Sequence, residues 1–211
     1  MNNYLKKRYK EELTLKKIGV YRSIDEHSSC GVGMVASINK IKSKSVVEMG
    51  IKALKSLYHR GAVDADGKTG DGAGLQVAIP KEFFIKEIHK MGKIFDNNLL
   101  ALGMIFLPRN DQRLQKYCKN IVEEELIKDD LLIYGWRKVP INLSFIGKKA
   151  NSTRPLVVQV IFSGNKKFSK GFFENQLYKI RRKIEKRINL KKIDNFYICS
   201  LSCRSVIYKG L

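Results

Sequence analysis

Residues 99–107 form a run of nine positions without a charged or polar side chain, and this run limits the folds open to the chain. Its length suits a strand that is covered on both faces. Apolar residues three or four apart predict amphipathic helices over 47–58, 114–126 and 173–188, and Pro80 begins another that reaches Ile88. Strands are predicted at 75–79, 131–139 and 156–162, followed by two that pair with each other, 196–201 and 205–208. The pattern predicts mixed helix and strand and leaves the strand order open.

The balance of charge is strongly basic. The 211 residues have a formal net charge of +21, and 44% of them are hydrophobic, which is typical of a folded domain. Such a charge is compatible with a nucleic-acid-binding module that uses the basic stretch 181–192. Lysines occur in every segment, however, and few aromatic residues lie among them. Solvated helix and strand faces are therefore favoured over a nucleic-acid partner.

The four cysteines, Cys30, Cys118, Cys199 and Cys203, form no CxxC pair and no cluster with histidine. A zinc site or a disulfide framework is therefore disfavoured, and reduced thiols indicate the cytoplasm. No run approaches the roughly twenty apolar residues of a membrane span. We therefore expect no membrane association.

A loop rich in glycine and aspartate covers residues 63–74. Residues 62–69 fit a relaxed phosphate-loop pattern with Ala62 in place of the first glycine. A phosphate loop requires a strand before it and a helix after it, and the order predicted here is the reverse. Asp64 and Asp66 would also present carboxylates to a polyanion. We therefore interpret the loop as a structural turn.

The segment that begins at Cys30 has an alternating apolar pattern. Every second side chain is apolar, which predicts a strand over 32–38: Val32, Met34, Ala36 and Ile38. Glycines beside the cysteine leave room for a ligand to approach the backbone. A free cysteine is most often a buried packing residue. Cys30 becomes a candidate nucleophile only because of the motifs that follow it.

Those motifs occur in a fixed order. They are Cys-Gly-Val-Gly at 30–33, His-Arg-Gly-Ala at 59–62, Asp-Gly-Lys-Thr-Gly-Asp-Gly-Ala-Gly at 66–74, Gly-Met-Ile-Phe-Leu-Pro at 103–108, Gly-Trp-Arg-Lys-Val-Pro at 135–140, Arg-Arg-Lys-Ile-Glu-Lys at 181–186, Phe-Tyr-Ile-Cys-Ser-Leu-Ser at 196–202 and Tyr-Lys-Gly-Leu at 208–211. Together they resemble the glutaminase domain of the glutamate synthase large subunit family, a class II glutamine amidotransferase of the N-terminal nucleophile type. The resemblance covers nearly all the chain from Cys30 onward.

The resemblance implies a fold and a mechanism. The fold is α+β, a partial four-layer αββα sandwich of the N-terminal nucleophile hydrolase type, incomplete at its C-terminus. Residues 1–29 are expected to be a propeptide that is cut off between Ser29 and Cys30, and 30–211 the leading part of the amidotransferase domain. Cys30 would attack the side-chain amide of L-glutamine. Its own α-amino group, with a pKa of about 7.7–8.0, would serve as the base.

The resemblance also assigns residues of the substrate pocket. Arg60 matches the family's arginine near the nucleophile, and Gly61, Asp71 and Gly72 would shape the pocket wall. The family's arginine for the glutamine α-carboxylate, and its Asn-Gly oxyanion hole, belong to a segment that this sequence does not contain. Loss of one oxyanion donor typically lowers the rate by about 10²–10³. We therefore expect the 211 residues alone to be weak or inactive, as a truncated product or as one piece of a split enzyme.

In the full-length family enzyme the partners are the remainder of the large subunit, here on the same chain or on a separate one, and either a small subunit or ferredoxin. FMN and an iron–sulfur cluster are expected only in that full-length enzyme; this segment is expected to hold no cofactor and no metal. Two alternatives stay open: a non-catalytic remnant that keeps residues 1–29 attached, and the basic nucleic-acid-binding module.

Overall fold

The computed structural model describes residues 7, 10, 11, 13, 14, 18, 31–39, 43–57, 61–70, 72–96, 99–165 and 167–209. The chain divides into two units, Met1–Met34 and Val35–Leu211. In the first unit, the described residues from 7 to 18 are helical, and Thr14 donates its hydroxyl to the carbonyl of Lys10 at 3.0 Å. Residues 31–34 have no regular secondary structure.

The second unit contains helices and strands in a mixed order along the chain. Its helices are α2 (Lys44–Ser56), α3 (Lys81–Lys90), α4 (Gln112–Lys128), α5 (Lys148–Thr153) and α6 (Lys170–Leu190), with a 3-10 turn, η3, at Leu143–Phe145. Its strands are β1 (Gly74–Ala78), β2 (Leu100–Leu107), β3 (Leu132–Lys138), β4 (Leu156–Ser163), β5 (Tyr197–Ser202) and β6 (Ser205–Lys209).

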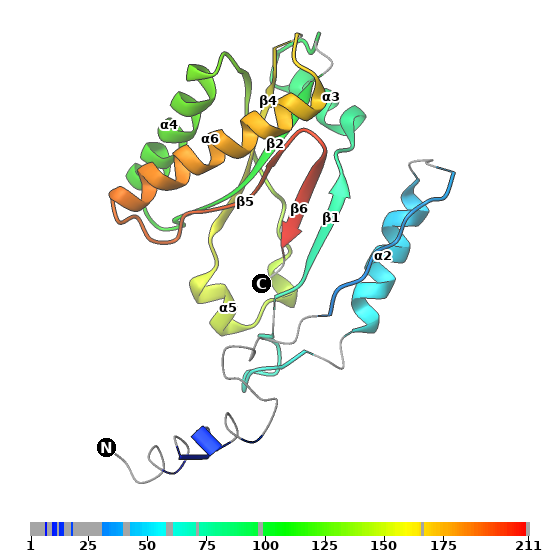
Figure 1. Cartoon of the computed structure of the whole chain (residues 1–211), viewed down its shortest axis with the longest axis vertical. Helices are drawn as coiled ribbons and strands as arrows, with labels where there is room; N and C mark the ends of the chain where they lie inside the picture. The colour runs from blue at the N-terminus through cyan, green and yellow to red at the C-terminus, as the bar shows by residue number, and fades with distance from the viewer. Residues whose placement is uncertain are drawn as a thin grey trace. The chain divides into compact units, whose positions relative to one another are not determined.

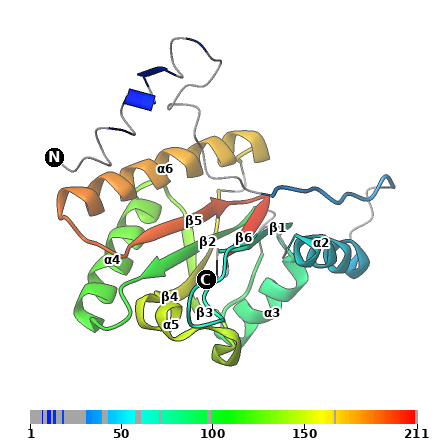
Figure 2. The same ribbon diagram turned by 90° about the horizontal axis from the view of Figure 1, so that it is seen from below.

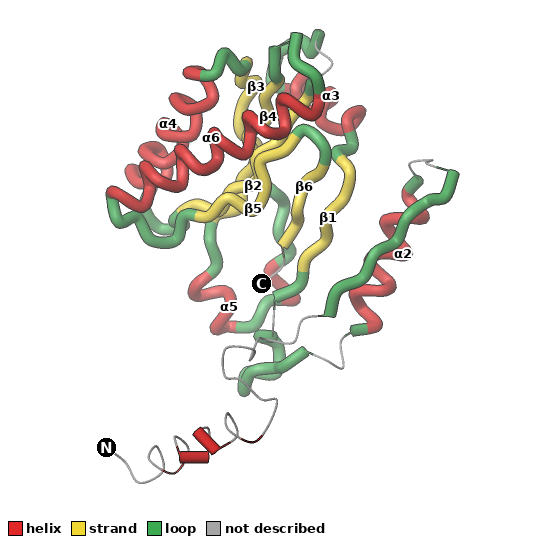
Figure 3. The backbone as a smooth tube through the Cα atoms, viewed as in Figure 1, coloured by secondary structure: helices red, strands yellow, loops and turns green. Residues whose placement is uncertain are grey.

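The strands form two antiparallel sheets (Figures 1 and 3). The larger sheet has the order β3-β4-β2-β5, so that β2 is bonded on both edges. The smaller sheet pairs β1 with β6, with Gly74 opposite Lys209 and Ala78 opposite Ser205. The strand order that the sequence left open is therefore set by pairs far apart in the chain.

Two hydrophobic clusters lie on opposite faces of the larger sheet. Along β2 the side chains alternate between them: Leu99, Ala101, Ile105 and Leu107 enter the cluster with α4 and α6, while Leu100, Leu102 and Met104 enter the cluster with α3 and the smaller sheet. Figure 2 shows α4 and α6 on one side of the strands and α3 on the other. This arrangement confirms the prediction that 99–107 is a strand covered on both faces.

The layers are those of an α+β domain. The first layer consists of the helices α4 and α6, the second is the larger sheet and the third is the smaller sheet. Helix α2 contacts the smaller sheet, because a Cβ on Gly50 would lie 3.5 Å from Leu75 Cδ1. The predicted fold class is confirmed. The helices predicted over 114–126 and 173–188 are α4 and α6, and the one beginning at Pro80 is α3.

The predicted strand over 32–38 is wrong. Residues 31–37 have no regular secondary structure, and Val32, Met34 and Ile38 are exposed to 92%, 90% and 96%. A strand needs a neighbour to receive its backbone hydrogen bonds, and none of the described strands pairs with this segment. Alternation alone was therefore an insufficient signal.

The predicted pairing of the last two strands is also wrong. β5 pairs with β2 and β6 pairs with β1, although only Cys203 and Arg204 separate them. At this point the chain passes from one sheet to the other, and Ile79, just after β1, donates its N–H to the carbonyl of Arg204 at 3.1 Å. The two-residue connection suggested a hairpin, but each strand pairs in a different sheet with a strand far from it in the sequence.

Two further boundaries differ from the prediction. The polar segment expected to be a loop between the strands at 131–139 and 156–162 contains η3 and α5. Helix α2 ends at Ser56 with Leu57 as its C-cap, before the expected end at residues 59–61. Residues 58–60 lie outside the described part of the chain.

Four basic side chains of α6, Arg181, Arg182, Lys183 and Arg187, are paired with carboxylates. Arg181 and Arg182 both bind Glu185, and Lys183 binds Asp129 at 3.1 Å. Arg187 reaches Glu124 and Glu125 on α4, at 2.6 and 2.7 Å. These pairs neutralise much of the stretch proposed for nucleic acid, which favours a solvated helix face.

Candidate functional site

The predicted site residues are only partly described. Gly61 and Gly72 are exposed; Gly61 precedes the glycine- and aspartate-rich loop and Gly72 lies within it. The remaining predicted residues lie outside the described residues: Ser29, Cys30, Arg60 and Asp71. The site is therefore built from the segments that flank them within the second unit.

Residues 61–70 form a tight turn. Val63 and Gly70 are joined as an antiparallel bridge, and Asp64 donates its N–H to the carbonyl of Thr69 at 2.6 Å. Gly67 has a φ of 69°, which is the left-handed region that glycine accepts at little cost. Helix α2 precedes the turn and strand β1 follows it. This is the reverse of a phosphate loop, so the interpretation as a structural turn is supported.

The carboxylate of Asp66 organises the inside of this turn. It accepts hydrogen bonds from the N–H groups of Lys68 and Thr69, at 3.0 and 2.6 Å, and from the Thr69 hydroxyl at 2.6 Å. The Thr69 hydroxyl is the largest of several causes that hold the pKa of Asp66 well below its usual range. Asp64 and Asp66 are thus both occupied by the chain itself, because Asp64 pairs with Lys149 at 2.5 Å.

The turn is attached to the start of α5. Lys149 donates its N–H to Asp66, Ala150 donates its N–H to the Thr69 hydroxyl, each at 3.4 Å, and Gly147 is buried against both turn residues. A Cβ on Gly147 would collide with Thr69 Oγ1 and Asp66 Oδ2. Only glycine allows this close an approach at position 147.

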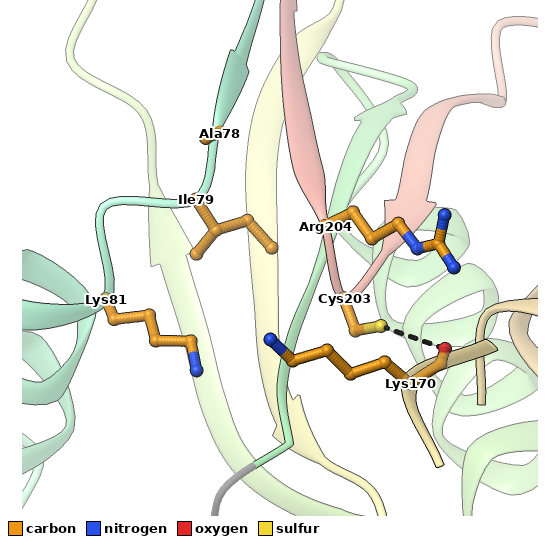
Figure 4. A pocket seen from close by; sticks show the side chains of 6 residues that line it. All are labelled: Ala78, Ile79, Lys81, Lys170, Cys203 and Arg204. Atoms are coloured by element: carbon orange, nitrogen blue, oxygen red, sulfur yellow. Dashed lines mark hydrogen bonds between the residues drawn. The ribbon is translucent and has the colours of Figure 1, made fainter. Parts of the chain in front are cut away.

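A pocket of about 340 Å³ lies where the two sheets separate (Figure 4). In Figure 4 the amines of Lys81 and Lys170 extend into it from opposite sides, below Ile79. The pocket is lined by Ala78, Ile79, Lys81, Lys170, Cys203 and Arg204. Three of these six residues are cationic and none is acidic, so the pocket can attract a small anion.

Sequence reasoning missed this pocket. Lys81 and Lys170 are the first residues of α3 and α6, and Arg204 lies in the connection between β5 and β6. The start of each helix is visible in the sequence, at Pro80 and at the N-cap Ser169. Their convergence is not, because it depends on the chain changing sheets at Cys203 and Arg204.

The three described cysteines are buried free thiols: Cys118, Cys199 and Cys203. Burial raises the pKa of Cys118 and of Cys199 to about 11. Burial, reinforced by a hydrogen bond to Glu174, raises the pKa of Cys203 to about 12. A thiolate is the reactive form of cysteine, so none of these three is suited to act as a nucleophile near neutral pH.

Among the described residues, no group of three or more His, Cys, Asp or Glu side chains is placed to hold a metal ion. None of the described helices is both long enough and apolar enough to cross a membrane.

Comparison with known proteins identifies the family of the chain. Residues 30–211 match the family model of the class II glutamine amidotransferases. The chain belongs to this family.

Its relatives include glutamate synthases. The chain is 52% identical over 197 residues to the glutamate synthase [NADPH] large chain of Azospirillum brasilense, covering 93% of this chain and 13% of that protein. It is 40% identical over 190 residues to the ferredoxin-dependent glutamate synthase of Pyropia yezoensis, covering 88% and 12%. The corresponding large chain of Bacillus subtilis is 34% identical over 200 residues, covering 93% and 13%. The chain thus spans about an eighth of the length of these relatives.

Proposed function

We propose that this chain is part of the glutaminase domain of a glutamate synthase and that Cys30 is its nucleophile. The observation that carries the proposal is that the family match begins at residue 30. The other three of the four cysteines support it indirectly, because each is buried with a raised pKa. In this proposal residues 1–29 are a propeptide and the catalytic domain begins at Cys30.

Cleavage between Ser29 and Cys30 gives the cysteine a free α-amino group. With a pKa of about 7.7–8.0, this group accepts the thiol proton near neutral pH. The thiolate sulfur attacks the side-chain amide carbon of L-glutamine. Collapse of the tetrahedral intermediate breaks the C–N bond, and the nitrogen leaves as ammonia after receiving the proton. Water then hydrolyses the thioester, which releases glutamate and restores the thiol.

Arg60, Gly61, Asp71 and Gly72 form part of the pocket in this proposal. A guanidinium beside a thiol favours the thiolate, and it can also pair with a carboxylate of the substrate. The exposed backbone at Gly61 and Gly72 supports the role of these two positions, since glycines in an exposed turn leave access to the nucleophile.

The wider reaction is inferred from the relatives. Their names include an NADPH enzyme and ferredoxin-dependent enzymes, so we propose that the ammonia is used for glutamate formation by the remainder of such an enzyme, on the same or a separate chain. A small subunit or ferredoxin would be the electron-donating partner. FMN and an iron–sulfur cluster would belong to that remainder. The free thiols of the described segment support a reducing compartment, the cytoplasm.

Intact mass of the purified chain tests the proposal first. Loss of residues 1–29 in the wild type and its absence in a Cys30→Ala variant are the expected results. A chain that keeps residues 1–29 would instead be the non-catalytic remnant. Ammonia release from glutamine should be weak in the 211-residue chain and should disappear in the processed Cys30→Ser variant. Strong ammonia release by the wild type would contradict the expected low activity of the 211-residue chain. Ammonia release by the serine variant at the wild-type rate would contradict the role of Cys30.

A further inference from the structure

The pocket where the two sheets separate, called the cationic pocket below, has no role in the proposed glutaminase reaction. All of its lining residues are described and belong to the second unit: Ala78, Ile79, Lys81, Lys170, Cys203 and Arg204. Its volume of about 340 Å³ is at the lower end of the range found for ligand sites, so it suits a small molecule. The charges on its walls decide which kind of molecule fits.

The backbone around the cationic pocket is held by hydrogen bonds. Ile79 donates its N–H to the carbonyl of Arg204 at 3.1 Å, and the thiol of Cys203 donates to the carbonyl of Lys170 at 3.8 Å (Figure 4). Ile79 and Cys203 are both buried. The apolar wall is therefore fixed in position, and its low polarity strengthens the attraction between charges that lie beside it.

Two cationic side chains of the pocket have no carboxylate to neutralise them. Lys170 and Arg204 form no ion pair with any carboxylate in the described part of the chain. Glu174, the acidic residue that contacts Cys203, uses one oxygen for Cys203 and the other for the hydroxyl of Ser202. Two positive charges are therefore available to an anion in the pocket.

The cations of the pocket come from three separate elements. Lys81 begins α3, Lys170 begins α6, and Arg204 lies in the connection between β5 and β6. The guanidinium of Arg204 lies beside the first turn of α6, since a Cβ on Gly171 would be 4.0 Å from Arg204 Nη2. An anion bound by all three would connect the two helices to the point where the chain changes sheets.

We propose that the cationic pocket binds a phosphate group, either as free phosphate or as part of a small phosphorylated molecule. Near pH 7 a phosphate group carries about −1.5 to −2 charges and three strong acceptor oxygens. Its charge matches that of Lys170 and Arg204, and lysine and arginine both bind phosphate in proteins. A single carboxylate carries one charge and would leave one of these two cations unneutralised. The site is independent of the proposed function, because none of its residues takes part in that scheme.

The test measures the binding of orthophosphate to the full 211-residue chain by calorimetry and by NMR. An ionic strength of about 0.15 M screens exposed charges beyond about 8 Å, which suppresses the general attraction of anions to a basic protein. The pocket variant is Lys170→Gln with Arg204→Gln. The control variant is Lys179→Gln with Arg113→Gln, which removes the same charge from exposed positions on α6 and α4 outside the pocket. All four side chains are exposed, so both variants should fold, and their melting temperatures without phosphate check this.

In the wild type, phosphate is expected to shift the backbone amide signals of residues 78–81, 170–171 and 203–204. The pocket variant should bind phosphate about tenfold more weakly or worse, and the control variant should stay within about twofold of the wild type. Acetate should bind the wild type about tenfold more weakly than phosphate or worse. The proposal is overturned by equal weakening in the two variants, by acetate binding as tight as phosphate binding, or by no phosphate binding at about 10 mM.

Methyl phosphate distinguishes the two sources of the phosphate group. If it binds at least as tightly as orthophosphate, the pocket has room for an ester and is assigned to a small phosphorylated molecule. If it binds more weakly, the pocket is assigned to free phosphate. Neither measurement requires removal of residues 1–29 or turnover of glutamine, so a failure of the glutaminase proposal would leave this result unchanged.

Discussion

The carboxylate of Glu174, on α6, accepts hydrogen bonds from the backbone N–H of Cys203 at 2.9 Å and from its thiol at 3.1 Å. Its other oxygen accepts the hydroxyl of Ser202 at 2.6 Å. Cys203 follows β5 directly and Arg204 precedes β6. A single side chain of the helical layer therefore holds the point at which the chain changes sheets.

Replacing Glu174 should destabilise the domain. In a Glu174→Ala variant the N–H of Cys203 and the hydroxyl of Ser202 lose their acceptor, and we expect a loss of about 1–3 kcal/mol in the free energy of unfolding. Urea denaturation measures it. Glu48→Ala is the control, because Glu48 forms an exposed pair with Lys44 at 3.2 Å and should contribute at most about 0.5 kcal/mol. Equal losses in the two variants would contradict the role given to Glu174.

The buried cysteines should be unreactive in the folded chain. With a pKa of about 12, Cys203 has a thiolate fraction on the order of 10⁻⁴ at pH 8. Cys118 and Cys199, at about 11, should also resist alkylation. Mass spectrometry after brief treatment with iodoacetamide at pH 8 should locate the label at Cys30 alone, and all four cysteines should react in urea. Rapid native labelling of Cys203 would show that its thiol is accessible and ionised.

The turn at Asp66 should remain intact in mild acid. The hydrogen bonds from Thr69 and Lys68 depress the pKa of Asp66 in the folded chain. The ionised carboxylate therefore stabilises the turn above the unfolded pKa of about 3.9, and this contribution is lost as the pH falls through the lower folded pKa. Carbon-detected NMR should show the Asp66 carboxyl titrating below that value in the folded chain and near it in urea. The idea fails if Asp66 titrates at the ordinary value in both.

Gly103 should not tolerate a side chain. On β2, between β4 and β5, its added Cβ would lie 2.6 Å from Val160 Cγ1 and 2.9 Å from Leu201 Cδ1. We expect Gly103→Ala to lower the free energy of unfolding by about 1–3 kcal/mol through overpacking. Gly50→Ala on α2 is the control, since its Cβ would lie 3.5 Å from Leu75 Cδ1, an ordinary contact. Alanine there should be neutral or stabilise by up to about 1 kcal/mol. Thermal or urea unfolding distinguishes the two.

Most helices and strands of the second unit could be predicted because burial of one face repeats apolar side chains at a regular spacing along the sequence. The side chains of α6 that are fully buried recur every three or four positions: Phe173, Leu177, Ile180, Ile184 and Ile188. The strand partners could not be predicted, because pairing is decided by residues far apart, as with Gln76 and Ser205, which are 129 residues apart and joined at 2.8 Å. For the same reason a local alternation at 32–38 indicated a strand, although none of the described strands pairs with this segment.

Some features of the candidate site could likewise be predicted from the sequence, and others could not. Motif order was enough to indicate the family, and the phosphate-loop interpretation could be rejected from the order of helix and strand alone. The attachment of the turn to the start of α5 could not be foreseen, since Thr69 and Ala150 are 81 residues apart. Nor could the cationic pocket, because Lys81 and Lys170 come together only through the stacking of the two sheets.

The smaller sheet has a consequence for how the protein is made. β1 leaves the ribosome long before β6, and Ala78 is 127 positions before its strand partner, Ser205. At about 5–20 residues per second, β1 waits on the order of ten seconds for its partner. During that time the larger sheet can assemble from β2, β3 and β4, while β1 still exposes the backbone groups that will bind β6. The nascent chain thus carries a strand edge open to misassembly, and chaperone binding to newly made protein should be concentrated there.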